Sequence, residues 1–225
     1  MAKTQITKPK STAKDRLLEA AVDVFGKYGF EAATTRMIAK KAGVNIASIP
    51  YYFNGKEGLY QAAITYIVEK IEAKFGTALQ NMAELATGEN PNREAARSAL
   101  ENLLGGIVSF MVGSPEAPRV ARMILREQLD PSAAYDIIYS RVMARVIDSI
   151  ATLLTVLMEN MSPRSARIRA MAMMGQVTVF RVGRETMVRM IGLEGYTQEE
   201  TDEIRRIVLE HTRGTIESLS ARPAG

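Results

Sequence analysis

The sequence predicts an all-α protein of about nine helices, with a small N-terminal helix-turn-helix domain and a larger C-terminal helical domain. Apolar residues recur at three- and four-residue steps over most of the chain, which is the period of an amphipathic helix. Capping side chains and glycines stand at the ends of these stretches, where helices begin and end. We find no two-residue alternation bounded by hairpin turns, and therefore expect no sheet.

The first expected helix begins after Thr12, because Asp15 follows at the spacing of a capping box, and it ends at Gly29. Its apolar stripe comprises Leu17, Leu18, Ala21, Val24, Phe25 and Tyr28. This spacing is typical of an amphipathic helix.

Two short helices are expected next. Residues 35–42 lie between a capping residue, Thr34, and a terminating glycine, Gly43. Residues 46–52 follow Asn45, which suits the cap position of a second short helix.

A long helix and several proline-marked helices account for the rest of the chain. The long helix runs from Lys56 to about Thr87 and would measure about 45 Å at about 1.5 Å per residue. Proline at the first helical position loses no intrahelical hydrogen bond, so a capping residue followed by proline marks a helix start. Such pairs are Asn90-Pro91, Ser114-Pro115, Asp130-Pro131 and Ser162-Pro163. Thr197 and Glu200 form a capping box for the last helix.

The positive charge is concentrated at the N-terminal end. Residues 1–60 contain ten Lys and Arg against five Asp and Glu, whereas the remainder contains 19 basic and 20 acidic residues. The net charge of the whole chain is +4. This asymmetry indicates an anionic partner for the N-terminal part, either nucleic acid or a membrane surface, and leaves open a solvated basic arm without a partner.

Composition excludes several kinds of chemistry. There is no cysteine, which rules out disulfides and thiolate nucleophiles, and the single histidine, His211, rules out a multi-histidine metal cage. We therefore expect no metal, no cofactor and no enzyme activity, and we interpret His211 as a helix-interface residue. The most apolar stretch, 150–158, has nine residues, whereas a helix that spans a bilayer needs about 20. Without a signal-peptide pattern, a cytoplasmic protein with no membrane partner is expected.

Residues 34–59 form a candidate helix-turn-helix. Gly43 allows a left-handed turn between the two short helices. A small apolar core is supplied by Ile38, Ala39, Val44 and Ile49. Ala47 and Ser48 are small enough to let the second helix approach base edges in a major groove. Side chains that suit phosphate oxygens or guanine edges surround it: Arg36, Ser48, Tyr51, Tyr52 and Lys56.

The wider pattern is more specific than a glycine-centred helix pair. Residues 25–59 read FGKYGFEAATTRMIAKKAGV followed by NIASIPYYFNGKEGL. From Thr12 to Tyr60 the chain resembles the DNA-binding domain of the TetR (tetracycline repressor) family of bacterial transcription regulators. It is also similar, in a general way, to the CecR or YbiH subgroup of that family.

The resemblance implies a ligand-responsive, sequence-specific DNA-binding regulator, most often a repressor, that acts as a homodimer on a palindromic operator. The implied partners are double-stranded operator DNA, a second copy of the chain and an unidentified small-molecule effector. The implied divisions are a basic flexible arm over 1–11, the DNA-binding domain over 12–60, and a ligand-binding and dimerisation domain over 61–225. Gly175, Gly183 and Gly214 fall inside expected helices. Close helix–helix approach, as in the dimeric four-helix bundle of the family, is a reason to tolerate them.

The DNA contacts of the family can be transferred by position. They fall on Thr35, Arg36, Asn45, Ile46, Ala47, Ser48, Tyr51, Tyr52 and Lys56. One position departs from the family, because Pro50 stands where most members have tyrosine. Proline lacks the N–H that would bond the Ile46 carbonyl, so we expect a recognition helix that is short or kinked at Ile49. Such a kink would alter the contacts inferred beyond Pro50, those of Tyr51 and Tyr52.

The C-terminal part offers ligand-binding candidates without a motif. Eleven of the 13 methionines follow residue 60, and methionine suits a pocket for apolar ligands as well as ordinary core filling. Arg119, Arg122 and Arg126 lie within two turns of one helix, where ion pairs within the chain and contact with an anionic ligand are both open. The candidate pocket residues are Phe110, Arg122, Met123, Arg126, Tyr135, Tyr139, Met173, Gln176 and Phe180.

Two other classes of function stay open at this point. One is a helical enzyme acting on an acidic substrate, although the chain lacks cysteine, a second histidine and a phosphate-binding glycine loop. The other is a helical adaptor that binds DNA or membrane non-specifically by charge.

Overall fold

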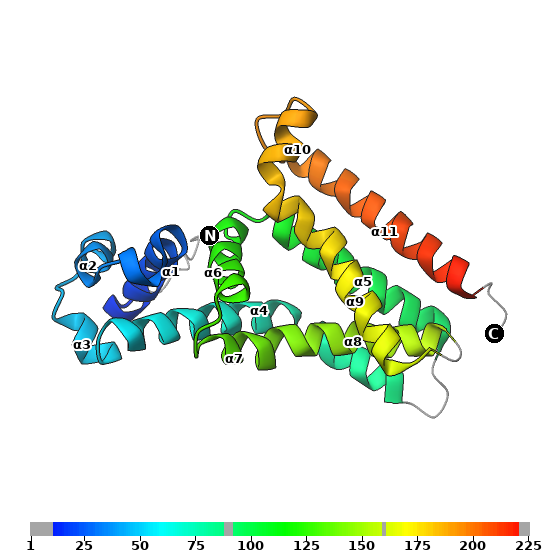
Figure 1. Ribbon diagram of the computed structural model, residues 1–225, viewed down its shortest axis with the longest axis horizontal. Coiled ribbons are helices and arrows are strands. Elements are labelled where there is room, and N and C mark those ends of the chain that lie inside the picture. Colours follow the sequence, from blue (N-terminus) through cyan, green and yellow to red (C-terminus); the bar gives the residue numbers. More distant parts are fainter. Residues whose placement is uncertain (1–10, 88–91, 159–160, 221–225) are drawn as a thin grey trace, which may run out of the picture.

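A computed structural model describes residues 11–87, 92–158 and 161–220, and it is all-α (Figure 1). Within these ranges there is no strand, and there are ten continuous helices when α7 (Tyr135–Ile138), α8 (Ala144–Leu157) and the π-helical segment between them are counted as one, against about nine expected from the sequence. Residues 1–10 of the expected basic arm lie outside the described residues, as do Asn90 and Pro91 of one expected helix start. The fold class predicted from helical periodicity is confirmed.

The N-terminal part contains α1 (Ala13–Ala32), α2 (Thr35–Ala42), α3 (Ser48–Phe53) and α4 (Lys56–Thr87). The C-terminal part contains α5 (Arg93–Gly113), α6 (Ala117–Leu129), α7 (Tyr135–Ile138), α8 (Ala144–Leu157), α9 (Pro163–Val182), α10 (Arg184–Met190) and α11 (Gln198–Ser220). A π-helical segment, Tyr139–Met143, joins α7 to α8 without a break, so these three segments form one continuous helix.

Four of the expected helix starts carry the capping bonds that the sequence predicts. The capping residues are Thr12 at α1, Thr34 at α2, Ser162 at α9 and Thr197 at α11. At α2, for example, the Thr34 hydroxyl accepts a hydrogen bond from the backbone N–H of Met37 over 3.2 Å. These side chains satisfy N–H groups that the first turn of a helix leaves unpaired.

Two boundaries in the N-terminal half differ from the expected ones. α1 continues past Gly29 to Ala32 through a kink, where Gly29 has a φ of 79°. α5 begins after Asn92, two residues beyond the expected cap at Asn90, and the Asn92 side chain accepts a bond from the N–H of Ala95 over 3.1 Å.

The helix starts expected at Ser114-Pro115 and Asp130-Pro131 are wrong, because α6 and α7 begin later, at Ala117 and Tyr135. Before α6, the Ser114 carbonyl accepts a bond from the N–H of Ala117 over 3.2 Å, which closes a turn. Before α7, the buried carboxylate of Glu127 accepts bonds from the backbone N–H and the hydroxyl of Ser132 over 3.1 and 3.0 Å. These bonds hold the chain in a turn past the proline.

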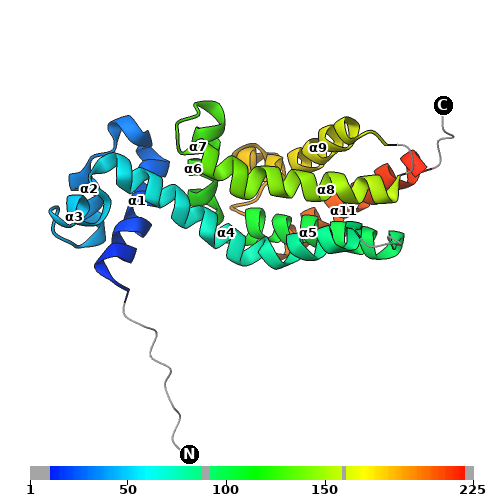
Figure 2. The same ribbon diagram turned by 90° about the horizontal axis from the view of Figure 1, so that it is seen from below.

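α4 connects the two parts of the molecule (Figures 1 and 2). Its first half packs against α1 and α3, and it also packs against α5, α7 and α8. The buried face of α4 includes Leu59, Ile64, Ile67 and Val68. α6 packs on α1 as well as on α5, whereas α9 and α11 pack on α5. Two helices, α4 and α6, therefore link the helix-turn-helix part to the C-terminal core.

The turn from α3 into α4 requires glycine at position 58. A Cβ on Gly58 would lie 1.8 Å from the backbone oxygen of Phe53. Beside this turn the rings of Phe25, Phe30 and Tyr60 stack or meet edge to face, with centroids 4.9 to 6.0 Å apart. These contacts fix the start of α4 against α1.

Gly58→Ala should therefore destabilise the protein by about 3 kcal/mol, at the upper end of overpacking costs. Gly76→Ala is the matched control in the same helix, because nothing lies within 4 Å of the added Cβ. It should stabilise the protein by about 1 kcal/mol through helix propensity. Urea denaturation measures both changes, and a Gly58→Ala protein as stable as the wild type would contradict the geometry of the turn.

Candidate nucleic-acid interface

α2, the turn that follows and α3 form a helix-turn-helix (Figure 1). Gly43 ends α2 in the left-handed region, with φ 65° and ψ 38°, as its sequence position predicts. The N–H of Val44 then returns to the carbonyl of Ala39 over 3.1 Å. Ile38 and Ile49 are fully buried, so α2 and α3 share one core with α1 and α4.

The residues before α3 form an exposed tip. The Asn45 side-chain oxygen accepts a bond from the N–H of Ala47 over 2.9 Å, and this turn leads the chain into α3. Asn45, Ile46 and Ala47 are exposed, and Ser48 is half-buried. Small side chains on an outer tip leave the backbone accessible to a groove, which is what a recognition helix requires.

The recognition helix is short, as expected, but it is not broken at Ile49. It begins at Ser48, two residues later than predicted, so Pro50 occupies the third helical position. N–H groups of the first turn have no intrahelical partner, and proline is therefore tolerated there. α3 continues to Phe53 and ends at Asn54, which takes a left-handed φ of 58°.

The other DNA-contact candidates on α2 and α3 are accessible. Arg36 is exposed and Thr35 is half-buried at the start of α2. Tyr51 and Tyr52 are exposed on α3, where their rings meet edge to face with centroids 4.8 Å apart. Their contacts with DNA stay a prediction.

Lys56 is turned toward α1. Its ammonium donates a hydrogen bond to the carbonyl of Glu31 over 3.2 Å and lies 4.5 Å from the centroid of the Phe30 ring. An ammonium has three N–H donors, so this bond leaves others for a phosphate. The sequence did not indicate this contact with α1, and the predicted phosphate contact of Lys56 stays a prediction.

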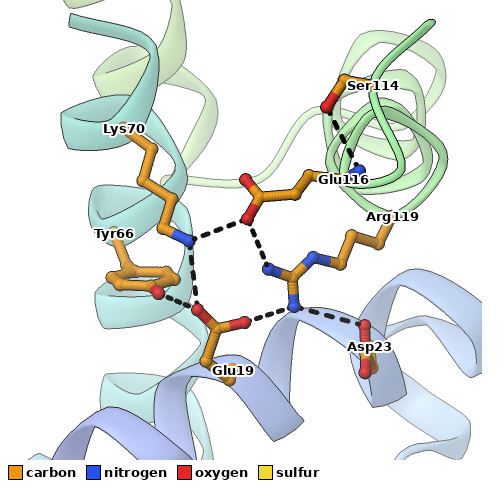
Figure 3. A network of polar contacts seen from close by, with 7 residues as sticks. All are labelled: Glu19, Asp23, Tyr66, Lys70, Ser114, Glu116 and Arg119. Atoms are coloured by element: carbon orange, nitrogen blue, oxygen red, sulfur yellow. Dashed lines mark hydrogen bonds and ion pairs between the residues drawn. The ribbon is translucent and has the colours of Figure 1, made fainter. Parts of the chain in front are cut away.

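A polar network joins α1, α4 and α6 beside the helix-turn-helix (Figure 3). Glu19 of α1 accepts hydrogen bonds from Tyr66 and from Lys70 of α4, the second over 3.1 Å. It also accepts one from Arg119 of α6, whose guanidinium lies 3.8 Å from the Asp23 carboxylate. One carboxylate of α1 therefore receives donors from both helices that link the two parts of the protein.

This network lowers the pKa of Glu19 to about 2. Burial alone would raise the pKa, but hydrogen bonds from Tyr66, Arg119 and Lys70 to the charged form outweigh burial. The carboxylate therefore contributes its full stabilisation above its ordinary pKa of 4.5, and that contribution is lost as the pH falls toward 2.

Two further contacts hold α6 against the DNA-binding part. Arg126 donates from Nε to the carbonyl of Gly26 and from Nη2 to that of Lys27, each over 3.2 Å. Gly26 and Lys27 lie just before the kink at Gly29, where α1 departs from helical geometry, so this arginine supplies donors to carbonyls next to the interruption. The hydroxyl of Tyr60 donates to the buried carboxylate of Glu127. No sequence signal reveals the Arg126 contact, because its partner is a backbone carbonyl 100 residues away.

The pocket candidates of the C-terminal part lie in several places. Tyr135 and Tyr139 have ring centroids 6.2 Å apart, and Tyr139 is exposed. Met123 and Met173 are buried core residues. Arg122 lines a hollow between α1, α2 and α6, and Gln176 lines another between α9 and α11.

His211 is exposed on α11, where it lines the hollow between α9 and α11. Among the described residues, no group of three or more His, Asp or Glu side chains is arranged to hold a metal ion. In the same ranges, no helix has both the length and the apolar character needed to cross a bilayer.

The exposed tip, the short recognition helix and the supporting helical domain define a helix-turn-helix transcription regulator of the two-part, all-α type. Residues 17–63 match the family model described as bacterial regulatory proteins, tetR family. Residues 96–219 match the C-terminal domain of the HTH-type transcriptional dual regulator CecR. The chain therefore belongs to the TetR family and, within it, to the CecR group.

Individual relatives agree with this assignment. CecR of Shigella flexneri is 32% identical over 212 residues, which cover 93% of this chain and 94% of that protein. The transcriptional regulator YttP of Bacillus subtilis is 39% identical over 80 residues, which cover 36% of this chain and 39% of YttP. The expected family and subgroup, and the function as a transcription regulator, are confirmed.

Two solved structures share the fold. One is AibR in complex with isovaleryl coenzyme A and operator DNA, with a TM-score of 0.64 at 13% identity over 89% of this chain and 97% of AibR. The other is a transcriptional regulator from Rhodococcus sp. Rha1, with a TM-score of 0.61 at 18% identity over 94% of this chain and 100% of that chain. At these identities the likeness concerns the fold alone.

Glu19→Gln should lower the free energy of unfolding at neutral pH by up to about 1 kcal/mol. The value is small because the Glu19 side chain is 37% exposed, and exposed ion pairs contribute little. The difference from wild type should be full above the ordinary pKa of 4.5 and should disappear as the pH falls to about 2.

Urea denaturation of both proteins at a series of pH values measures this difference. Glu185→Gln is the control, because among the described residues Glu185 forms an ion pair only with Arg189 of the same helix, α10, and is well exposed. A Glu19→Gln difference that does not shrink in acid, or one that Glu185→Gln reproduces, would contradict the role given to Glu19.

Proposed function

We propose that this regulator is a ligand-responsive homodimer that binds a palindromic operator through α3. The observation that carries the DNA-binding part of the proposal is the exposed tip of Asn45, Ile46 and Ala47 that leads into Ser48, together with the exposed Arg36 of α2. In a two-fold symmetric dimer, the two α3 helices would enter successive major grooves about 34–36 Å apart. The proposed DNA contacts are Thr35, Arg36, Asn45, Ile46, Ala47, Ser48, Tyr51, Tyr52 and Lys56.

The proposed divisions are an arm over 1–11, a DNA-binding domain over 12–60 and a ligand-binding and dimerisation domain over 61–225. α4 crosses the second boundary, and Arg119 and Arg126 attach α6 to α1. A ligand that moves α6 or α4 would therefore change the spacing of the two α3 helices. It lowers operator affinity only if it binds the altered state more tightly than the operator-binding state.

An exposed apolar face on α9 supports the homodimer. Ile168, Met171, Val179 and Val182 are each more than half exposed, and their spacing places them along one side of α9. The opposite side of α9 packs into the core of the same chain. A helix that is apolar on both sides is normally buried on both, so we propose that a second copy covers the outer side.

Polar atoms and glycines on the same surface support the same arrangement. Arg169 Nε and Gln176 Oε1 are buried without a hydrogen-bond partner among the described residues, and they border a hollow of about 530 Å³ between α9 and α11. Leaving such a group unpaired costs about 1–3 kcal/mol. Gly175 and Gly214 lie inside helices with open space where a Cβ would stand, although glycine there costs about 1 kcal/mol. Close approach by α9 and α11 of a second copy would account for both features.

The effector is proposed to be a small molecule that binds the C-terminal domain. AibR, which shares the fold, has been solved with both isovaleryl coenzyme A and operator DNA, and this supports an effector-controlled operator complex. The nine residues named from the sequence lie in several places, so each stays a separate candidate for the pocket lining rather than part of one site. Repression is the effect that we propose at the operator, and the dual regulation named for the Shigella relative is the second outcome to be measured.

We do not propose catalysis, and we propose that the protein acts in the cytoplasm. An adaptor that binds only by charge is not favoured, because both parts of the chain match regulator domains. Competition binding distinguishes the regulator from the adaptor. An adaptor would bind operator and random duplex equally, whereas a sequence-specific regulator would prefer the operator.

Arg36→Ala should weaken operator binding by about 1–3 kcal/mol, because a bidentate contact to a base is lost. The operator is first identified by genome-wide binding of the tagged full chain, and affinities are then measured at one fixed salt concentration. Arg189→Ala is the matched control, because Arg189 is well exposed on α10, outside the helix-turn-helix. Unchanged affinity of the Arg36→Ala protein would remove Arg36 from the interface.

Met171→Glu should convert the dimer to monomers, because it places a charge in the centre of the proposed apolar interface. Light scattering coupled to size-exclusion chromatography at micromolar concentration measures the mass. Leu129→Glu is the control, because Leu129 is equally apolar and exposed but lies on α6. A wild-type chain that is monomeric, or a Met171→Glu protein that stays dimeric, would contradict the proposed interface.

A further inference from the structure

α6 directs three arginines toward α1, and two of them are engaged there. Arg119 binds Glu19, and Arg126 binds the carbonyls of Gly26 and Lys27 just before the kink in α1. Arg122 lies between them, one helical turn from each, and its Cβ lies 3.6 Å from where a Cβ on Gly26 would stand. No carboxylate among the described residues lies within 4.0 Å of the Arg122 guanidinium, whereas Arg119 has three such neighbours.

Arg122 lines a hollow of about 640 Å³ between α1, α2 and α6. The other cations around this hollow are Lys27 of α1 and Lys40 and Lys41 of α2. Its lining contains one acid, Asp23, which already pairs with Lys41 over 3.1 Å. Lys27, Lys40 and Arg122 are therefore left without a counter-ion from the part of the chain that the structure describes.

A further cation, Arg181, interacts with Arg122. Arg181, near the end of α9, is half-buried, and its pKa is lowered by burial and by the charges of Arg184 and Arg122. Like charges that interact raise the free energy of the protein, and a bound anion would lower it. This repulsion adds to the excess of cations that line the hollow.

The remaining lining of the hollow is apolar. Val24 and Met37 contribute aliphatic surface, and the ring of Tyr28 is exposed beside them. The volume falls within the range of about 300–1,000 Å³ that is typical of small-molecule sites. The Lys27 ammonium lies 5.1 Å from the centroid of the Tyr28 ring, so a flat ligand group would stack on the ring next to that charge.

We propose that this hollow binds a small molecule that carries a phosphate group and a flat ring, as nucleotides do, with the phosphate against Arg122, Lys27 and Lys40. Guanidinium and ammonium groups are the usual partners of phosphate, and several together suit a group with more than one negative charge. A bound ligand would bridge α1 and α2 to α6. The site is separate from the proposed operator contacts, and its occupation does not rest on them.

A phosphate of DNA flanking the operator is the competing source of the same charge. Lys40 and Lys41 lie in the last turn of α2, at the end opposite to Arg36, and α6 forms one wall of the hollow. Because these cations lie away from Arg36 and α6 encloses one side of the hollow, the placement favours a small molecule over a DNA duplex.

Isothermal titration of the full chain with ADP and with pyrophosphate, without DNA and at low salt, tests the proposal. Saturable binding is expected at one molecule per chain, with ADP tighter than pyrophosphate because of its ring. Arg122→Gln should weaken ADP binding at least about tenfold, since one charge-assisted pair is worth about 1.5–3 kcal/mol. Arg189→Gln, which removes the same charge from exposed α10, should leave ADP binding unchanged.

Circular dichroism and thermal melting establish that each variant is folded. Absence of binding by both probes would overturn the proposal, as would equal weakening by Arg122→Gln and Arg189→Gln. Loss of operator affinity in Arg122→Gln without any ADP binding would assign these cations to flanking DNA instead. Because the titration contains no DNA, a failure of operator binding and a failure of this site are distinguishable.

Discussion

The position of the recognition helix depends on how α6 holds α1. Arg119 binds the carboxylate of Glu19, and Arg126 binds two backbone carbonyls just before the kink in the same helix, so α6 contacts α1 at two points. The aromatic cluster around Tyr60 then fixes α1 to the start of α4. Because the ion pairs are partly exposed, each contributes only about 0.2–1 kcal/mol. Such a contact orients the DNA-binding part and can still be rearranged by a ligand.

Two surfaces of the single chain carry groups that are unfavourable without a partner. In the part of the chain that the structure describes, one has exposed apolar side chains and unpaired polar atoms, and the other has cations without a counter-ion. The outer side of α9 exposes an apolar stripe, and buried atoms of Arg169 and Gln176 without a hydrogen-bond partner among the described residues border the hollow between α9 and α11; both features suit a second protein surface. The hollow beside Arg122 gathers cations around a small apolar wall, which suits a small anion. The hollow borders α1 and α6 directly, whereas α9 packs on α5, which in turn packs on α4 and α6. Ligand binding would therefore act directly on the contact between α6 and α1, and assembly would act on it only indirectly, through α5.

Local features of the fold could be predicted from the sequence, whereas long-range contacts could not. The caps at Thr34 and Ser162 and the turn at Gly43 depend on residues within a few positions, and the structure has them where the sequence predicts. The late start of α7 depends on Glu127, which the sequence could not pair with Ser132. Pro50 is tolerated because α3 starts two residues later than the expected cap at Asn45 indicates. The proline therefore lies in the first turn of α3, where its missing N–H breaks no helical hydrogen bond.

In the candidate site, too, the local features could be predicted from the sequence and the long-range contacts could not. The exposed tip before α3 follows from the order of small and polar residues, but the contacts that orient it come from α6, about 100 residues away. Amino-acid composition suggests pocket residues without giving their positions, and the structure distributes the candidates among the core, two hollows and the exposed surface.

Dimethyl sulfate footprinting of the full chain on its operator tests the central claim most directly, because the reagent methylates guanine N7 in the major groove. Entry of two α3 helices predicts protected guanines in two stretches on one face of the duplex, centred about 10–10.5 base pairs, or one helical turn, apart. Guanines that stay reactive throughout the bound site, or protection spread evenly along it, would contradict the claim that the tip before α3 enters the major groove.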